Sequence, residues 1–98
     1  YNCMGFLMQI EVEGVHRVIH RAKKPVMVIK SMAAGRVTPF VGLNFVWHTI
    51  RDCDMVTVGT MSPREAAECI EISRAALERR KPTLEGRSSP SKGTIVDA

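Results

Sequence analysis

The segments Pro25-Val-Met-Val-Ile-Lys30 and Met55-Val-Thr-Val-Gly-Thr60 decide the fold class of this 98-residue chain. Both are short, apolar and rich in β-branched residues, and the first shows no alternation of apolar and polar side chains. Such runs are typical of central strands that are buried on both faces, as in parallel sheets covered by helices. We therefore expect two parallel strands, over residues 25–30 and 55–58.

Two amphipathic helices are expected beside these strands. Apolar residues recur at three- and four-residue spacing from Glu11 to about Ala22, and again from Leu43 to Ile50. This spacing places apolar side chains on one face of a helix. The sequence Lys-Lys-Pro at 23–25 ends the first helix, and Asp-Cys-Asp at 52–54 ends the second.

A third helix has the strongest local signal in the chain. Ser62 is a good N-cap, Pro63 suits the first helical position, and Glu65 is placed to complete a capping box by accepting from the Ser62 amide. Acidic residues lie early in this helix and arginines late, which complements the helix dipole. Lys81-Pro82 ends it.

The order helix, strand, helix, strand, helix predicts an α/β fold with parallel strands and right-handed crossovers. A chain of this length leaves the edges of such a sheet uncovered. The chain also begins without an initiator methionine, so we expect a fragment. We predict that residues 1–80 are the C-terminal units of a (β/α)₈ (TIM) barrel, with two or three parallel strands and three helices, and that residues 81–98 form a flexible polar tail rich in Ser, Gly and Pro.

The composition indicates which kinds of partner and which cellular compartment to expect. The formal charge is +4, but the basic residues gather near expected helix ends and few aromatic side chains are present, which argues against nucleic-acid binding. No apolar run approaches the length of a membrane span, so no membrane contact is expected. Cys3, Cys53 and Cys69 are odd in number and far apart, which predicts reduced thiols in a cytoplasmic protein and no structural zinc site.

A candidate anion site follows from the positions of residues at the strand ends. The residues at or just beyond the carboxyl ends of the two strands are Lys30, Gly35, Arg36, Gly59 and Thr60, and Ser62 caps the following helix. Barrel enzymes place their active sites on this face. Glycine lets a ligand approach the backbone, and free amides at a helix start donate to anions. In the alternative interpretation, Gly59 makes a tight turn, Ser62 only caps the helix and Arg36 faces solvent.

Lys30 is the candidate catalytic residue, because burial at the end of an apolar strand would make it a nucleophile, a proton shuttle or a phosphate contact. The alternative is an outward side chain with its ammonium in water. His16 and His20 are four residues apart, a spacing able to hold a metal, but no third ligand supports them. We expect a solvated pair and no metal site.

The segments Pro25-Val-Met-Val-Ile-Lys-Ser-Met-Ala-Ala-Gly-Arg36 and Asp54-Met-Val-Thr-Val-Gly-Thr-Met-Ser-Pro-Arg-Glu65 resemble the last two strand–loop units of aldo/keto-reductase-like barrels. The resemblance covers about residues 1–77. It implies binding of the NADP phosphates, with Lys30, Ser31, Arg36, Gly59, Thr60 and Ser62 as cofactor contacts. The family's catalytic residues come from earlier strands, so we expect the parent protein to be an enzyme and this chain alone to lack a complete catalytic centre.

Two alternatives remain open. Class I aldolase barrels also show a lysine before a small-residue loop, and likeness to them implies a lyase with Lys30 as an acid–base or Schiff-base lysine. A non-catalytic chain that associates with itself would instead bury the open sheet edges in a homo-oligomer. For the reductase-like and the aldolase-like barrels, the expected partners are a phosphate-bearing small molecule and the rest of the barrel.

Overall fold

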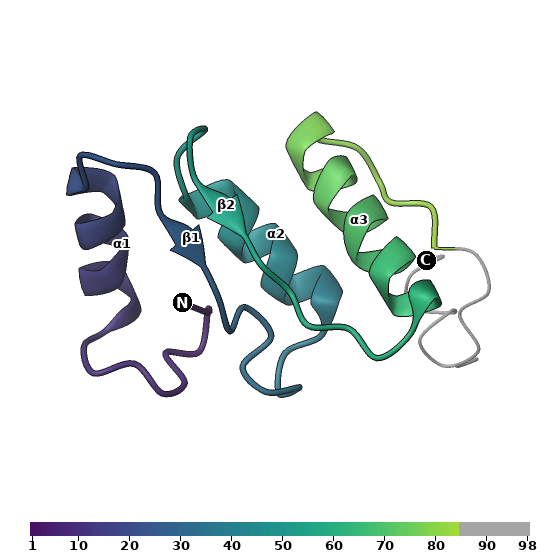
Figure 1. The fold of residues 1–98 in the computed structure, drawn as a ribbon, viewed down its shortest axis with the longest axis horizontal. Helices are drawn as coiled ribbons and strands as arrows, with labels where there is room; N and C mark the ends of the chain where they lie inside the picture. The colour runs from purple at the N-terminus through teal and green to yellow at the C-terminus, as the bar shows by residue number, and fades with distance from the viewer. Residues whose placement is uncertain (85–98) are drawn as a thin grey trace.

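The computed structural model describes residues 1–84, and residues 85–98 lie outside that description. Three helices and two strands alternate along the chain (Figure 1). In order they are α1 (Val12–Arg21), β1 (Met27–Val28), α2 (Pro39–Thr49), β2 (Met55–Val56) and α3 (Pro63–Glu78). The predicted order of elements is thus confirmed, and each helix lies close to its expected position.

The prediction of a partial (β/α)₈ barrel is wrong. Helices of 10, 11 and 16 residues dominate the described part of the chain, whereas each strand has only 2 residues. The two strands are parallel, with Met27 beside Met55 and Val28 beside Val56. Residues 1–84 contain no further strand, so the structure is mostly helical. Apolar runs correctly located two strands, but a local pattern does not specify how many neighbours a strand has.

The backbone at Lys30 explains why β1 is so short. Lys30 has φ 65°, in the left-handed region, so the extended run cannot continue past Ile29. The last ladder contact is the hydrogen bond from the Thr57 amide to the Val28 carbonyl, at 2.9 Å. Of the strand segments predicted at 25–30 and 55–58, only Met27–Val28 and Met55–Val56 therefore pair as strands.

The start of α3 matches the sequence closely. Ser62 Oγ accepts from the Glu65 amide at 3.1 Å, and Pro63 is the first helical residue. The Glu65 carboxylate accepts from the Met61 amide at 3.2 Å, rather than from the Ser62 amide. The capping box is thus present but displaced by one residue.

Two apolar clusters hold the helices against the sheet. The first joins Ile19 of α1, Val28 of β1 and Val46 of α2. The second joins Leu43 of α2 to Cys69 and Ile72 of α3. In Figure 1 β1 lies between α1 and α2, β2 crosses over α2, and α3 lies on the far side of α2 from α1. Val28, Val56 and Val58 of the strand segments all point into the clusters formed with the helices. All three helices thus pack on one face of the sheet.

A buried ion pair fastens the amino ends of both strands. The Asp54 side chain is fully buried and accepts from the Val26 amide at 2.8 Å and the Arg51 amide at 2.9 Å. The Arg51 guanidinium binds the same carboxylate through Nε at 3.0 Å and donates to the carbonyls of Ala22 and Lys24. These hydrogen bonds tie the end of α1 and the starts of both strands to one carboxylate.

The opposite face of the sheet is uncovered within residues 1–84. Side chains alternate along the two strands, and Met27, Ile29, Met55 and Thr57 are exposed. Met27 and Met55 are register partners, so their side chains lie next to each other on this face. Parallel sheets are normally covered on both faces, so this uncharged open face is unusual.

The part of the chain expected to begin a flexible tail is partly fixed. Within 81–84, the Thr83 amide donates to Glu71 at 2.8 Å, and Leu84 packs against the second apolar cluster. The rest of the expected tail, residues 85–98, lies outside the described residues. None of the helices described over residues 1–84 is long and apolar enough to cross a membrane.

Replacing Asp54 with Ala is predicted to destabilise the fold by about 3 kcal/mol, because the substitution leaves the Arg51 charge and two amides without their acceptor. Urea unfolding followed by circular dichroism measures the change. Asp52→Ala is the matched control, since Asp52 is exposed and the net charge changes equally. Equal losses in both variants would contradict the structural role of Asp54.

The same carboxylate sets a pH dependence. The hydrogen bonds from Arg51 hold the pKa of Asp54 well below its ordinary value. A depressed pKa contributes stability that is complete above the ordinary carboxyl range and lost as the pH falls below about 4. Unfolding free energy should therefore drop on acidification in the unmodified chain, and less steeply in Asp54→Ala.

Candidate functional site

A pocket of about 240 Å³ lies at the carboxyl ends of the two strands. Four of the residues predicted from sequence line it: Lys30 and Ser31 after β1, Gly35 in the same loop, and Gly59 after β2. The parallel pairing of β1 with β2 brings these segments together from opposite halves of the chain. The predicted convergence of the two strand ends is therefore confirmed.

The loop from Lys30 to Gly35 has an unusual backbone. Lys30, Ala33, Ala34 and Gly35 all have positive φ, at 65°, 51°, 56° and 84°. A left-handed residue other than glycine costs roughly 1–2 kcal/mol. Such strain is found preferentially at binding sites, where the surrounding structure holds it in place. The conformation bends the loop tightly beside the pocket.

This bend leaves several backbone donors without a protein acceptor. Within residues 1–84, the amides of Ser31, Met32 and Ala34 form no hydrogen bond to protein, and neither does the amide of Gly59. All four residues line the pocket. Successive free amides in a turn form concave sites that bind anions.

Ser31 provides a side-chain donor as well. The residue is only 2% exposed, and its Oγ has no hydrogen-bond partner among the described residues. Gly42 of α2 packs directly on its backbone, since a Cβ at residue 42 would lie 2.8 Å from the Ser31 carbonyl oxygen. Buried hydroxyls in native proteins are almost always hydrogen-bonded, and this unpaired one belongs to a residue that lines the pocket.

Gly59 contributes open space. A Cβ built at this residue meets no atom within 4 Å, and its φ lies outside the left-handed region. The absence of a side chain is therefore required neither by the backbone conformation nor by packing. It is the arrangement expected where a ligand approaches the main chain.

The charges around the pocket have one sign. No Asp or Glu occurs between Glu13 and Asp52, or between Asp54 and Glu65. Lys30 is exposed, and no carboxylate of residues 1–84 pairs with it. The loops on both sides of the pocket therefore lack anionic side chains, and their field favours an anionic ligand.

Three other predicted contacts do not line this pocket. Arg36 places its guanidinium over the Phe6 ring, 3.9 Å from the centroid. Thr60 faces a separate apolar pocket of about 210 Å³ beside Cys69. Ser62 is engaged in the α3 cap, and the Glu65 carboxylate lies within 3.4 Å of its hydroxyl. The start of α3 is therefore already occupied by a carboxylate, which disfavours a second anion there.

Asn2 is a site-forming residue that sequence analysis missed. It is completely buried, and its amide donates to the carbonyls of Phe6 and Lys30 at 3.1 and 3.3 Å. Its Oδ1 accepts from the amides of Met4 and Phe6. Asn2 thus closes the turn at residues 2–6 and fastens it to the loop that lines the pocket. The only signal in the sequence was a turn-forming residue near Gly5.

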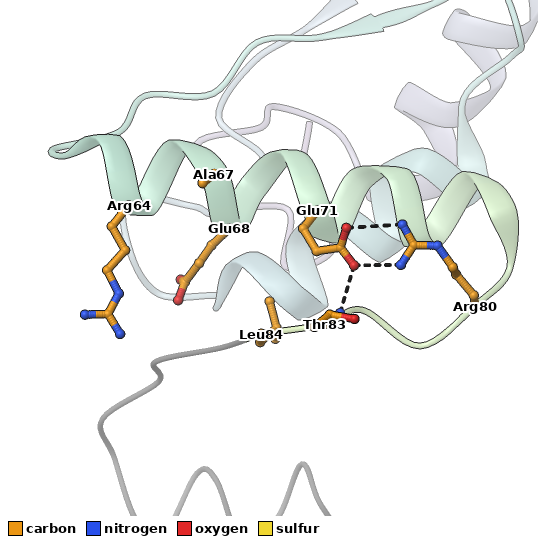
Figure 2. Close-up of a pocket in the computed structure, with 7 residues that line it drawn as sticks. All are labelled: Arg64, Ala67, Glu68, Glu71, Arg80, Thr83 and Leu84. Atoms are coloured by element: carbon orange, nitrogen blue, oxygen red, sulfur yellow. Dashed lines mark hydrogen bonds and ion pairs between the residues drawn. The ribbon is translucent and has the colours of Figure 1, made fainter.

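A larger hollow, about 600 Å³, lies on the outer side of α3 (Figure 2). Glu71 accepts two hydrogen bonds from Arg80, at 2.6 and 3.1 Å, and one from the Thr83 amide. Arg80, followed by that amide, lowers the pKa of Glu71 to about 2. Glu71 and Arg80 already pair with each other. This hollow therefore offers a ligand fewer unpaired hydrogen-bonding groups than the pocket at the strand ends does.

The histidines and cysteines form no site in the described residues. The His16 and His20 rings are 4.2 Å apart, and His20 Nε2 lies 2.7 Å from the Thr49 carbonyl oxygen. No group of three potential metal ligands occurs in residues 1–84. The three cysteines are free: Cys69 is buried, Cys53 is exposed and Cys3 is partly buried.

Comparisons with known proteins found no relative of this chain. No protein-family model matches the chain, and no curated protein and no solved structure is similar to it at a significant level.

Proposed function

We propose that this chain binds a phosphate-bearing small molecule in the pocket between the Lys30–Gly35 loop and Gly59. The buried, unpaired hydroxyl of Ser31 is the observation that carries the proposal. A phosphate oxygen accepts hydrogen bonds and would pair this hydroxyl together with the free amides of Ser31, Met32 and Gly59. The exposed Lys30 ammonium would neutralise its charge.

The size of the pocket limits what part of the ligand it encloses. Pockets for drug-sized ligands span roughly 300–1,000 Å³, whereas this one measures about 240 Å³. It suits a phosphate group and its nearest atoms. If the ligand is NADP, as the resemblance implies, only a phosphate of it fits inside and the remainder lies over the surface.

A catalytic role for Lys30 stays a prediction without support from its surroundings. The expectation depended on burial of the amine, but Lys30 is exposed and its backbone turns it out of the strand. We therefore assign Lys30 to charge neutralisation in binding. A cytoplasmic location is also a proposal, supported by three free cysteines that form no disulfide.

Ser31→Ala is predicted to weaken orthophosphate binding about tenfold, the scale of one hydrogen bond to a charged group. The variant should unfold at the same urea concentration as the parent, because the hydroxyl has no partner to lose. Gly59→Val should abolish binding by filling the pocket without straining the backbone. Isothermal titration calorimetry with orthophosphate measures both effects.

A charge-matched pair separates site binding from general attraction. Lys30→Ala and Lys23→Ala remove one positive charge each from exposed positions, but only Lys30 lines the pocket. We expect Lys30→Ala to weaken binding and Lys23→Ala to leave it unchanged. Equal effects, or no orthophosphate binding by the parent chain at millimolar concentration, would reject the proposed function.

Self-association is the second candidate, and the open sheet face favours it. Met27, Ile29 and Met55 form an uncharged apolar surface, and two copies related by a two-fold axis would bring identical surfaces together. Stable dimers bury about 800 Å² on each partner, more than three side chains supply. We therefore expect a weak dimer with a second copy of this chain.

Light scattering coupled to size-exclusion chromatography tests this second candidate. The mean mass should rise with protein concentration in the parent, and Met27→Lys should hold the chain as a monomer. Val18→Lys is the control, since Val18 is an equally exposed apolar residue on α1. A parent chain that stays monomeric at every concentration would rule the dimer out.

A further inference from the structure

We infer that the ligand of the proposed phosphate site is a phosphate monoester with an apolar organic part, and that this part lies on the open face of the sheet. The inference rests on the proposed function, because it assigns the phosphate to the pocket at the strand ends. It adds the class of ligand and the surface that binds the rest of the molecule. That open face consists of the exposed side chains of Met27, Ile29, Met55 and Thr57.

The open face and the pocket share a residue. Thr57 is exposed on the open face, two residues after Met55, and it also lines the pocket. On the neighbouring strand segment, the exposed Ile29 directly precedes Lys30, which lines the pocket as well. The open face therefore reaches the pocket along both strand segments. The part of a ligand next to its phosphate lies within reach of this face.

The side chains of the open face are not part of the core. Side chains alternate between the two faces of a strand, and Val28 and Val56 pack into the apolar cluster below the sheet. Met27, Ile29 and Met55 therefore lie on the other side, where they are 58%, 52% and 44% exposed. They leave apolar area in water that a ligand can cover.

The two surfaces select different parts of one ligand. None of the four side chains of the open face is charged. A polar group placed over Met27 and Met55 would lose hydrogen bonds to water without gaining a strong partner, whereas an alkyl chain or a ring would gain from burial. The pocket instead offers unpaired donors and the Lys30 ammonium. The combination favours a molecule that is anionic at one end and apolar at the other.

The extent of the open face fits a small ligand better than a protein. Stable protein interfaces bury about 800 Å² on each partner, which three apolar side chains do not supply. The pocket of about 240 Å³ encloses only a phosphate and its nearest atoms. Each methylene that leaves water for the open face tightens binding by up to about fourfold, so even a short chain changes the affinity measurably.

Isothermal titration calorimetry with three soluble monoesters tests the inference. The parent chain should bind hexyl phosphate at least about tenfold more tightly than methyl phosphate, the scale of two or three buried methylenes. Ribose 5-phosphate has an organic part of similar size that is polar, and it should bind less tightly than hexyl phosphate. Equal affinities for hexyl and methyl phosphate, or ribose 5-phosphate binding as tightly as hexyl phosphate, would overturn the inference.

Met55→Gln tests the position of the apolar part. Met55 does not line the pocket, so orthophosphate affinity should stay unchanged while the ratio of hexyl to methyl phosphate affinity falls. Ile29→Thr should lower the same ratio and keeps a β-branched side chain in the strand segment. Met61→Gln is the matched control, since Met61 is 91% exposed and lies outside both the open face and the pocket. Equal ratios in Met55→Gln and Met61→Gln would contradict the assignment.

Vesicles separate a free monoester from a lipid headgroup of the same chemistry. In a bilayer the acyl chains are surrounded by other lipids and cannot lie on the sheet, so we expect the ligand to be free in solution. The parent chain and Met55→Gln should then float equally with vesicles of phosphatidic acid in phosphatidylcholine. Flotation of the parent alone would overturn the assignment of a free ligand.

The two proposals fail in different ways. If the parent chain binds orthophosphate but binds hexyl phosphate no better than methyl phosphate, the inference about the open face is overturned and the proposed function stands. If orthophosphate does not bind, the proposed function itself is rejected, whatever hexyl phosphate does.

Discussion

The buried carboxylate of Asp54 is the constraint on which the arrangement of this chain depends. It receives hydrogen bonds from Val26 and Arg51, and Arg51 in turn holds the carbonyls that end α1. A sheet of two two-residue strands is too small to be stable by itself. The ion pair instead fixes where the strands begin, so that their carboxyl ends, and the pocket there, lie side by side.

The pocket combines features that stability alone does not explain. Three non-glycine residues of the loop have left-handed backbones, the Ser31 hydroxyl is buried without a partner, and the amides nearby are unpaired within the described chain. Each costs free energy in the unliganded protein. Opposite the loop, Gly59 leaves space that no packing requires. A bound anion would offset the cost of the unpaired donors together.

Local signals in the sequence predicted the local structure well. Apolar spacing located α1 and α2, the Ser62 cap located α3, and two apolar runs located the strands. The barrel could not be deduced in the same way, because closure depends on neighbouring strands that a local pattern does not contain. The expected strand also ended early, since nothing in the sequence marks the left-handed backbone of Lys30.

The candidate site could also be predicted only in part, because local signals do not show which distant residues a side chain contacts. Lys30, Ser31, Gly35 and Gly59 follow the strands and line one pocket. Arg36, Thr60 and Ser62 do not line it, because their side chains are directed by contacts with residues distant from the strand ends or by the helix cap. Asn2 and Asp54 were missed because their roles depend on hydrogen bonds across 28 residues of chain.

Amide chemical shifts of ¹⁵N-labelled chain during an orthophosphate titration test the central claim most directly. The account predicts saturable shifts at Ser31, Met32, Ala34 and Gly59, whose amides are free at the pocket, and none at Thr83, whose amide is held by Glu71. Shifts confined to the basic stretch at residues 17–24, or no saturable shift at all, would contradict it.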